Sequence, residues 1–327
     1  MGFLQETPIV VAEIGNNHGG SLDLAKRMVL AALEAGTSYV KFQTMIPERL
    51  LSRDHPAFEE FSREALSFDA FRELHRFCAE HGAVFLSTPF DPDSANFLAE
   101  LGVPAFKISS GDLTYIPFLV HVARKHKPIL LSTGCSTLEE IDRAVAAIRR
   151  ETEAELILMH CTAAYPCPDE EANLRVIPSL AQQYGCRVGF SDHTLGIEIP
   201  LAAAALRAVV IEKHFTTDRS LPGGDNGTSI QSNELGHLVT GVRRISVALG
   251  TGDRDLTDAE VPRRVRMRRS LVARRDMQPG ETVRAEDVDA VRPGEGLGPS
   301  SLAAVVGRTL ASGLARGQRF RPDILRV

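Results

Sequence analysis

Short apolar runs alternate with amphipathic stretches along the first 250 residues of this 327-residue chain. Each run is rich in Val, Ile, Leu and Phe and is bounded by Gly or Pro, which is typical of a buried strand. The eight runs span residues 8–15, 38–44, 83–90, 105–111, 128–134, 156–162, 187–194 and 209–216. The helix-like stretches between them span residues 22–35, 58–81, 94–102, 116–126, 138–149, 173–184 and 197–207. This alternation predicts a parallel sheet with right-handed helical crossovers.

Polar residues in these runs favour a closed (β/α)8 TIM barrel. Strands that are buried on both faces should carry no charge, yet charged and polar side chains gather where the runs end. They are Glu13, Lys41, Gln43, Thr88, Lys107, Ser110, Ser132, His160, Ser191, His193, Glu212 and His214. A (β/α)8 barrel forms its active site from such strand ends. The alternative is an open doubly wound sheet, but the Gly-rich segment 13–20 lacks the G-x-G-x-x-G spacing typical of that fold.

The composition changes after Gly250. Residues 251–269 are rich in Gly, Asp and Thr and end in a run of arginines, which predicts a linker between a barrel at 1–250 and a second domain at 270–327. Short strand-like runs and turn residues predict that this second domain is small and β-rich. A domain of that size buries little core alone. We therefore expect it to pack against a barrel, either its own or a neighbour's.

Composition and charge exclude several function classes. The net charge is −5, and the only basic run is 263–269, so we expect no nucleic-acid partner. No signal peptide or membrane span is visible, and the five cysteines are odd in number and form no C-x-x-C pair. These features favour a cytoplasmic protein with reduced thiols. We expect Cys161 and Cys167, which lie near the polar strand ends, to be buried apolar filler.

Two histidines on neighbouring strands indicate a metal site. Side chains alternate along a strand, so His193 shares a face with Ser191, and His214 shares a face with Glu212. Two imidazoles from adjacent strands suit a divalent cation and leave positions for water and substrate. The alternative is that each histidine only hydrogen-bonds a backbone carbonyl. We expect that structural role for the histidines without such a partner, which are His18, His81 and His160.

Two lysines on the predicted strands indicate an anion site. Lys41 and Lys107 point into the same barrel mouth, where hydroxyl groups can help to bind a phosphate or carboxylate. Those hydroxyl groups belong to Thr88, Ser110, Ser132 and Ser191. The alternative is an internal ion pair with Glu13 or Glu212. The residues alone therefore predict a metal-assisted enzyme for a small phosphorylated substrate, and they do not name the reaction.

The motifs that carry these residues resemble the sialic acid synthase family. They span residues 12–20, 40–44, 85–91, 106–111, 131–134, 160–162, 165–166, 191–196 and 211–215. Further segments resemble the C-terminal antifreeze-like (SAF) domain of that family, at residues 269–272, 280–281 and 292–294. The resemblance covers nearly the whole chain in order. It implies condensation of phosphoenolpyruvate with an N-acylamino sugar aldehyde to a nine-carbon 2-keto acid, with release of phosphate.

The resemblance also assigns roles to individual residues. It implies that His193 and His214 hold a divalent metal, with Mn²⁺ favoured over Mg²⁺ or Co²⁺, and that Glu13 and Glu212 are catalytic carboxylates. Phosphoenolpyruvate contacts fall on Lys41, Thr88, Lys107, Ser110, Ser132 and Ser191. Sugar contacts fall on Gln43, Tyr165 and Asp225. Arg292 matches an arginine that the tail of one subunit delivers to its partner, which implies a domain-swapped homodimer.

Three departures from the family pattern leave the acceptor open. Asp112, which we group with the catalytic residues, stands where the family usually has Glu, and Ala163 lacks a usual polar group. The loop at Asp225 and Asn226 lacks a histidine that often follows. The acceptor is expected to resemble N-acetylmannosamine, with modified, 6-deoxy or phosphorylated sugars as variants.

Two other functions stay open as alternatives. One is a synthase of octulosonate or heptulosonate type that uses a shorter aldose, and the C-terminal domain argues against it. The other is a non-catalytic sugar-binding relative. The presence of both lysines, both histidines and Glu13 argues against that alternative.

Overall fold

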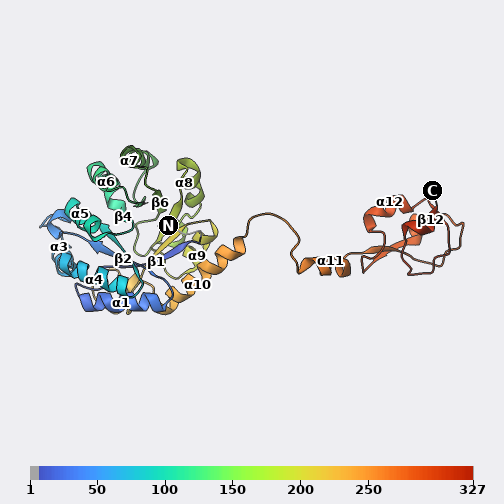
Figure 1. The fold of residues 1–327 in the computed structure, drawn as a ribbon, viewed down its shortest axis with the longest axis horizontal. Coiled ribbons are helices and arrows are strands. Elements are labelled where there is room, and N and C mark those ends of the chain that lie inside the picture. Colours follow the sequence, from blue (N-terminus) through green and yellow to red (C-terminus); the bar gives the residue numbers. More distant parts are fainter. Residues whose placement is uncertain (1–6, 327) are drawn as a thin grey trace. The chain divides into compact units, whose positions relative to one another are not determined.

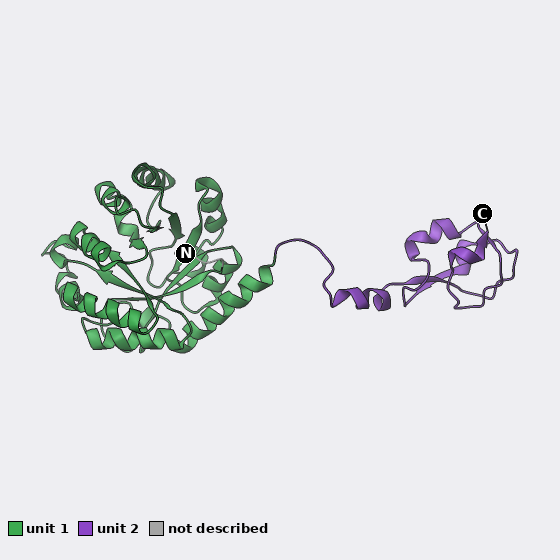
Figure 2. Cartoon of the chain, in the orientation of Figure 1, with its two compact units in different colours: residues 1–250 green, residues 251–327 purple. Residues whose placement is uncertain are grey.

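A computed structural model describes residues 7–326 of the chain (Figure 1). The chain divides after Gly250 into two compact units, which Figure 2 shows in different colours. Unit 1 contains the alternating strands and helices, and unit 2 contains the β-rich tail.

Unit 1 is the predicted (β/α)8 TIM barrel. Its strands are β1 (Ile9–Gly15), β2 (Tyr39–Thr44), β3 (Val84–Pro89), β4 (Phe106–Ile108), β5 (Ile129–Ser132), β6 (Leu156–His160), β7 (Val188–Asp192) and β8 (Val210–His214). They pair in the order β3-β2-β1-β8-β7-β6-β5-β4, and each of these ladders is parallel. The two strands that end this order, β3 and β4, approach each other and complete the ring. All carboxyl ends of the strands therefore meet at one mouth.

Helices surround the strands (Figure 1). They are α1 (Leu22–Glu34), α2 (Pro47–Leu50), α3 (Phe58–Glu64), α4 (Phe68–Glu80), α5 (Pro92–Leu101), α6 (Ile116–Ala123), α7 (Leu138–Glu151), α8 (Val176–Tyr184), α9 (Glu198–Ala205) and α10 (Ser232–Leu249). Helical spacing places one apolar stripe of each against the sheet. In α1, for example, Ala25, Met28, Val29 and Ala32 are buried.

The barrel interior has its own apolar layer below the mouth. It consists of Ile9, Val11, Leu86, Ala105, Leu130, Ile157, Met159 and Val210, all of which are buried. Such layers fill the inside of a (β/α)8 barrel, so the barrel is a packed core rather than a pore. The polar strand ends lie beyond this layer, where the strands open toward the connecting loops.

Three elements of unit 1 differ from the prediction. The stretch at 58–81 is two helices, because Ser67 starts α4 by accepting a hydrogen bond from the Ala70 amide (3.2 Å). The run at 105–111 keeps only three strand residues and then turns into a 3₁₀ segment, Ser110–Asp112. Helix α10 was not among the predicted helices, although it is amphipathic and buries Leu235, Leu238, Val239 and Val242.

Unit 2 contains two small antiparallel ladders around a compact apolar core. Strand β9 (Ser270–Ala273) pairs with β10 (Val288–Val291), and β11 (Thr309–Leu310) pairs with β12 (Leu325–Arg326). Helix α12 (Leu302–Val305) contributes Val305 to the core. Helix α11 (Glu260–Met267) lies inside the segment 251–269 that we predicted to be a linker, and none of its residues is buried. Among residues 7–326, no helix is both long and apolar enough to cross a membrane.

Candidate active site

A cavity of about 320 Å³ lies where the barrel strands end. Its lining contains most of the predicted site residues, which come from all eight strands or the loops that follow them. They are Glu13, Gln43, Thr88, Lys107, Ser110, Ser132, Tyr165, Ser191, His193, Glu212 and His214. The fold therefore gathers side chains that are far apart in sequence, such as Glu13 and His214, because parallel strands end at one mouth.

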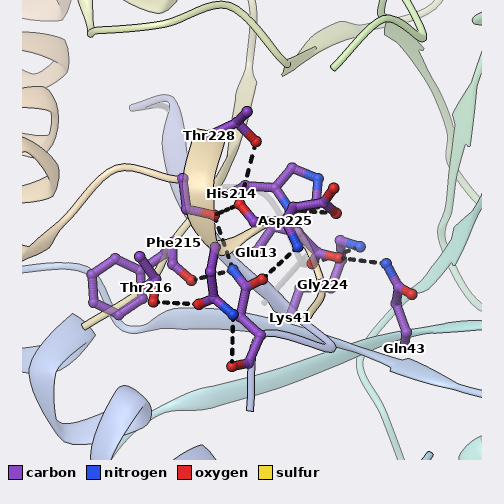
Figure 3. Close-up of polar contacts among 12 residues, drawn as sticks. Glu13, Lys41, Gln43, His214, Phe215, Thr216, Gly224, Asp225 and Thr228 are labelled. Carbon is purple, nitrogen blue, oxygen red and sulfur yellow. Dashed lines mark hydrogen bonds and ion pairs between the residues drawn. The ribbon is translucent and has the colours of Figure 1, made fainter. Parts of the chain in front are cut away.

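Four charged side chains are buried together at this cavity, three of which (Glu13, Lys107 and Glu212) line it, while Lys41 does not. The Nζ atom of Lys41 lies 2.8 Å from Glu13 Oε2 and 3.7 Å from Glu212 Oε1, and Lys107 Nζ lies 3.4 Å from Glu212 Oε1. None of the four side chains is more than 6% exposed. Figure 3 shows the pair of Lys41 and Glu13. The internal ion pairs that we considered as an alternative to an anion site are thus present.

These ion pairs leave room for a bound anion. An ammonium group has three hydrogen-bond donors. Lys41 donates to Thr88 Oγ1 (2.9 Å) as well as to Glu13, and Lys107 donates to Ser132 Oγ (2.7 Å). Hydroxyl groups and ammonium groups are therefore held side by side at the cavity wall. An anion can replace one of these neutral acceptors without leaving a lysine unpaired.

The two carboxylates at the cavity base differ in their ionisation. Burial raises the pKa of Glu13 well above its ordinary value, although Lys41 opposes the shift. Burial acts in the same direction on Glu212, but Lys107 and Lys41 outweigh it and the pKa of Glu212 falls below its ordinary value. Ser191 also donates a hydrogen bond to Glu212 Oε1 (3.0 Å). Glu212 is therefore a fixed negative charge, whereas Glu13 can exchange a proton closer to neutral pH.

The two predicted metal ligands lie next to each other, with ring centroids 5.5 Å apart. His193 donates through Nδ1 to the carbonyl of Thr162 (2.9 Å), which leaves Nε2 as its acceptor nitrogen. The Nδ1 atom of His214 is buried without a hydrogen-bond partner, 3.4 Å from Asp225 Oδ2 (Figure 3). Burial lowers the pKa of His193 to about 4 and that of His214 to about 3.

These two imidazoles fit a divalent cation. Both are neutral at physiological pH, which is the form that binds metal, and the hydrogen bond of His193 to a backbone carbonyl fixes its ring as in known metal sites. In the described part of the chain, no group of three or more His, Cys, Asp or Glu side chains is placed to hold a metal ion. A metal here would therefore take its remaining ligands from water and substrate.

A buried ion pair holds the ends of the two histidine-bearing strands together. Lys213 Nζ lies 2.6 Å from Asp192 Oδ2, and neither side chain is more than 1% exposed. The other oxygen of Asp192 accepts hydrogen bonds from the backbone amide and the hydroxyl of Thr194 (both 2.9 Å). These contacts fix the backbone on both sides of His193. This pair was not among the residues predicted from the sequence, although Lys213 immediately precedes His214.

Two buried asparagines, for which the sequence predicted no role, hold the loop that carries Asp225. Asn17 Oδ1 accepts from the Asp225 amide (2.8 Å), and Asn17 Nδ2 donates to the Phe215 carbonyl (2.9 Å). Asn226 donates to the Asn17 carbonyl (3.3 Å) and accepts from Thr216 Oγ1 (2.6 Å). We call these two residues the asparagine clamp. Its only sequence signal was the unusual Asn226.

Some predicted residues lie elsewhere. Asp112 does not line the cavity, and burial raises its pKa to about 6. Arg292 is exposed in unit 2 and lines a cavity of that unit. Cys161 is buried as expected, but it lines the active-site cavity and contacts Ser110 Oγ (3.1 Å). Of the histidines that we expected to be structural, His81 and His160 hydrogen-bond backbone carbonyls, at Phe77 and Ala172, whereas His18 Nδ1 accepts from the Gly20 amide.

Comparisons with known proteins agree with this architecture. The chain is 37% identical to the N,N'-diacetyllegionaminic acid synthase of Legionella pneumophila over 95% of this chain and 92% of that protein. It is 34% identical to the human N-acetylneuraminate-9-phosphate synthase, over 93% of this chain and 89% of that one. The crystal structure of an N-acetylneuraminic acid synthetase from Leptospira borgpetersenii matches with a TM-score of 0.76 and 36% identity, over 79% of this chain and 90% of that one.

Family models cover both units. Residues 28–254 match the NeuB family, and residues 268–326 match the SAF domain. The resemblance predicted from the motifs is thus confirmed. The chain is an enzyme that belongs to the NeuB family and carries a SAF domain at its C-terminal end.

Proposed function

We propose that the chain condenses phosphoenolpyruvate with an N-acylamino sugar aldehyde to give a nine-carbon 2-keto acid. In this reaction carbon 3 of phosphoenolpyruvate forms a bond to the aldehyde carbon, water adds to carbon 2, and inorganic phosphate leaves by C–O cleavage. The observation that carries the proposal is that one cavity is lined on one side by a lysine and hydroxyl groups and on the other side by two neutral histidines. The names of two relatives, an N,N'-diacetyllegionaminic acid synthase and an N-acetylneuraminate-9-phosphate synthase, support it.

The lysine side of the cavity is suited to phosphoenolpyruvate. This substrate carries a phosphate and a carboxylate, and charge-assisted hydrogen bonds from ammonium groups are the strong ones. We assign its contacts to Lys41, Thr88, Lys107, Ser110, Ser132 and Ser191. Glu212 stays ionised between the lysines and keeps them in place. Because Ser110 follows β4 and Ser132 ends the neighbouring strand β5, a small anion can reach both.

The histidine side is suited to the aldehyde. We assign a divalent cation, Mn²⁺ or else Mg²⁺ or Co²⁺, to His193 Nε2 and His214 Nδ1. When bound, such an ion polarises a carbonyl oxygen and lowers the pKa of water. Tyr165 packs against both rings, with its centroid 4.3 Å from that of His193 and 6.0 Å from that of His214. Tyr165, Gln43 and Asp225 can therefore orient the sugar beside the two histidines.

Glu13 is the group that we assign to proton transfer. A general acid or base works best when its pKa lies near the working pH, and burial raises the pKa of Glu13 in that direction. Its Oε1 atom lies 3.4 Å from Gln43 Nε2, on the sugar side, while Oε2 faces Lys41. Glu13 is thus placed between the two substrates. Asp112 does not line the cavity, so we assign it no contact with substrate.

We further propose that the working unit is a homodimer in which the SAF domain of one chain supplies Arg292 to the site of its partner. Arg292 is exposed in unit 2, so its guanidinium is free to reach a ligand. The segment from Thr251 to Asp258 forms no regular helix or strand, which gives the tail length to reach. Closed two-fold symmetry is the commonest arrangement of oligomers and would create two equivalent sites.

A phosphate-release assay tests the function. The purified chain is incubated with phosphoenolpyruvate, Mn²⁺ and a panel of N-acylamino sugars. Shorter aldose phosphates are tested in parallel as acceptors, because the alternative synthase type would use them. We expect phosphate release to depend on both phosphoenolpyruvate and an N-acylamino sugar, with a nine-carbon keto acid as product. Release with a five-carbon or four-carbon aldose phosphate alone would assign the chain to the alternative synthase type.

A further inference from the structure

A second cavity adjoins the active site and has a different chemical character. Its volume is about 430 Å³, and it shares Gln43, Phe90 and Tyr165 with the first cavity. Tyr165, one of the shared residues, packs against both histidine rings, where the aldehyde end of the sugar would react. Asp225 also lines the second cavity at this end, 3.4 Å from His214 Nδ1. The remaining lining faces the distal end of the sugar and consists of Asn16, Leu50, Leu51, Glu60, Phe61, Glu64 and Gly224.

This distal lining is acidic and apolar. Glu60 and Glu64 contribute two carboxyl groups, and no Lys or Arg is among the described residues that line the cavity. Glu64 is 7% exposed and accepts a hydrogen bond from the Gly224 amide (3.2 Å), so its position is fixed. A negative charge on the ligand would therefore meet carboxyl groups of the lining and no cation of the lining.

One buried acceptor points to a neutral ligand with a donor. Asn16 lines this cavity and is 7% exposed, and its Oδ1 atom has no hydrogen-bond partner. A buried acceptor without a partner is costly, so a donor on the ligand would stabilise it. Sugar hydroxyl and acylamino N–H groups are such donors. Leu50, Leu51 and Phe61 are only partly buried and offer an apolar wall for methyl groups.

We infer that the acceptor is an uncharged sugar with methyl-bearing substituents, that Asn16 accepts a hydrogen bond from it, and that Glu60 and Glu64 exclude acceptors with a distal phosphate. This inference rests on the proposed function and narrows it. It concerns only the end of the sugar away from the aldehyde. A phosphate there would lie beside the carboxyl groups of Glu60 and Glu64, whereas a hydroxyl group could donate to Asn16 and a methyl group could pack against the apolar wall.

A matched pair of substrates tests the inference. N-acetylmannosamine and its 6-phosphate differ only at the distal end, and the 6-deoxy analogue adds an apolar end. With the full chain, phosphoenolpyruvate and Mn²⁺, we expect kcat/KM to be more than about tenfold higher for the neutral sugars than for the 6-phosphate, as repulsion between nearby charges predicts. Equal or better use of the 6-phosphate would overturn the inference and leave the function standing. Failure of every sugar would refute the proposed function itself.

Charge reversal in α3 supplies a matched control. Glu60→Lys should shift the ratio of kcat/KM toward the 6-phosphate, whereas Glu59→Lys, on the same helix but outside the cavity, should leave the ratio unchanged. Equal ratios in both variants would show that the acidic wall does not select the acceptor.

The contact of Asn16 is tested separately. Asn16→Leu should raise the KM for the sugar without changing the KM for phosphoenolpyruvate, and circular dichroism checks its fold. An unchanged sugar KM would remove Asn16 from the site.

Discussion

Lys41→Met removes the ammonium group that lies between the two buried carboxylates of the active site. Lys41 is 3% exposed, so solvent cannot replace the lost contacts. If Lys41 donates to phosphoenolpyruvate, the loss of a charge-assisted hydrogen bond costs about 1.5–3 kcal/mol of binding, which is a factor of about 10 to 150 in Kd. The same change leaves Glu13 without its partner and should lower the free energy of unfolding by about 3–5 kcal/mol. Binding and stability must therefore be measured separately.

Calorimetric titration with phosphoenolpyruvate measures the binding, because the chain has no tryptophan to report it by fluorescence. Urea unfolding followed by circular dichroism measures the stability. The double variant Lys41→Met/Glu13→Gln removes both charges of the pair, and it should recover part of the lost stability but not the affinity. The matched control is Lys26→Met, which removes a lysine paired with Glu73 on the outer helices. This variant should change neither the affinity for phosphoenolpyruvate nor the stability strongly.

Two results would refute this reasoning. Unchanged affinity in Lys41→Met would mean that the lysine does not contact the anion. Full recovery of affinity in the double variant would mean that Lys41 serves only the internal ion pair, which was the alternative open from the sequence. Only a persistent loss of affinity in a stable double variant supports direct anion binding.

Three further predictions concern the metal, Asp112 and the dimer. EDTA should abolish turnover, and Mn²⁺ should restore it. The variants His193→Ala and His214→Ala should keep the fold but show less bound metal in elemental analysis. Full activity after metal removal would contradict the metal site. Burial raises the pKa of Asp112 from 3.8 to about 6 in the folded chain. The folded state therefore binds this proton more tightly than the unfolded state, and the contribution of Asp112 to the free energy of unfolding falls as the pH rises from about 4 to 6. Asp112→Asn should therefore stabilise the chain toward urea at pH 7, by about 1–2 kcal/mol, but not at pH 3. Mixing Arg292→Ala with His214→Ala chains should restore part of the activity, and failure after verified subunit exchange would contradict a shared site.

The barrel could be predicted from sequence because its strands are short, apolar and bounded by turn residues. Each predicted run overlaps an observed strand, and the errors lie at the ends, as for β4, where Ser110 starts a 3₁₀ turn. Helix α10 was missed, although the capping pair of Gln231 and Glu234 is a helix-start signal that could have found it. Helix α11 falls in the segment predicted to be a linker, because its arginines and its lack of buried residues are typical of a solvated segment.

The site was predictable to the extent that its residues occupy strand ends. Parallel strands bring these ends together without further information, so Lys41, Lys107, His193 and His214 could be grouped from spacing alone. Loop residues carry no such rule. Asn16 lies in a loop, and Glu60 and Glu64 on α3 read as part of a solvated helix face, so their approach to Asp225 depends on how loops far apart in sequence fold over the mouth. Their roles required the structure.

The asparagine clamp ties the loop after β1 to the loop after β8 across 209 positions of sequence. Contacts of such long separation form late, because the intervening chain must first be ordered. On the ribosome, Glu13 and both lysines emerge well before β8 does. We therefore expect a nascent chain to be unable to seat a sugar until its last barrel strand has been added, so that unfinished chains in the cell leave the acceptor untouched.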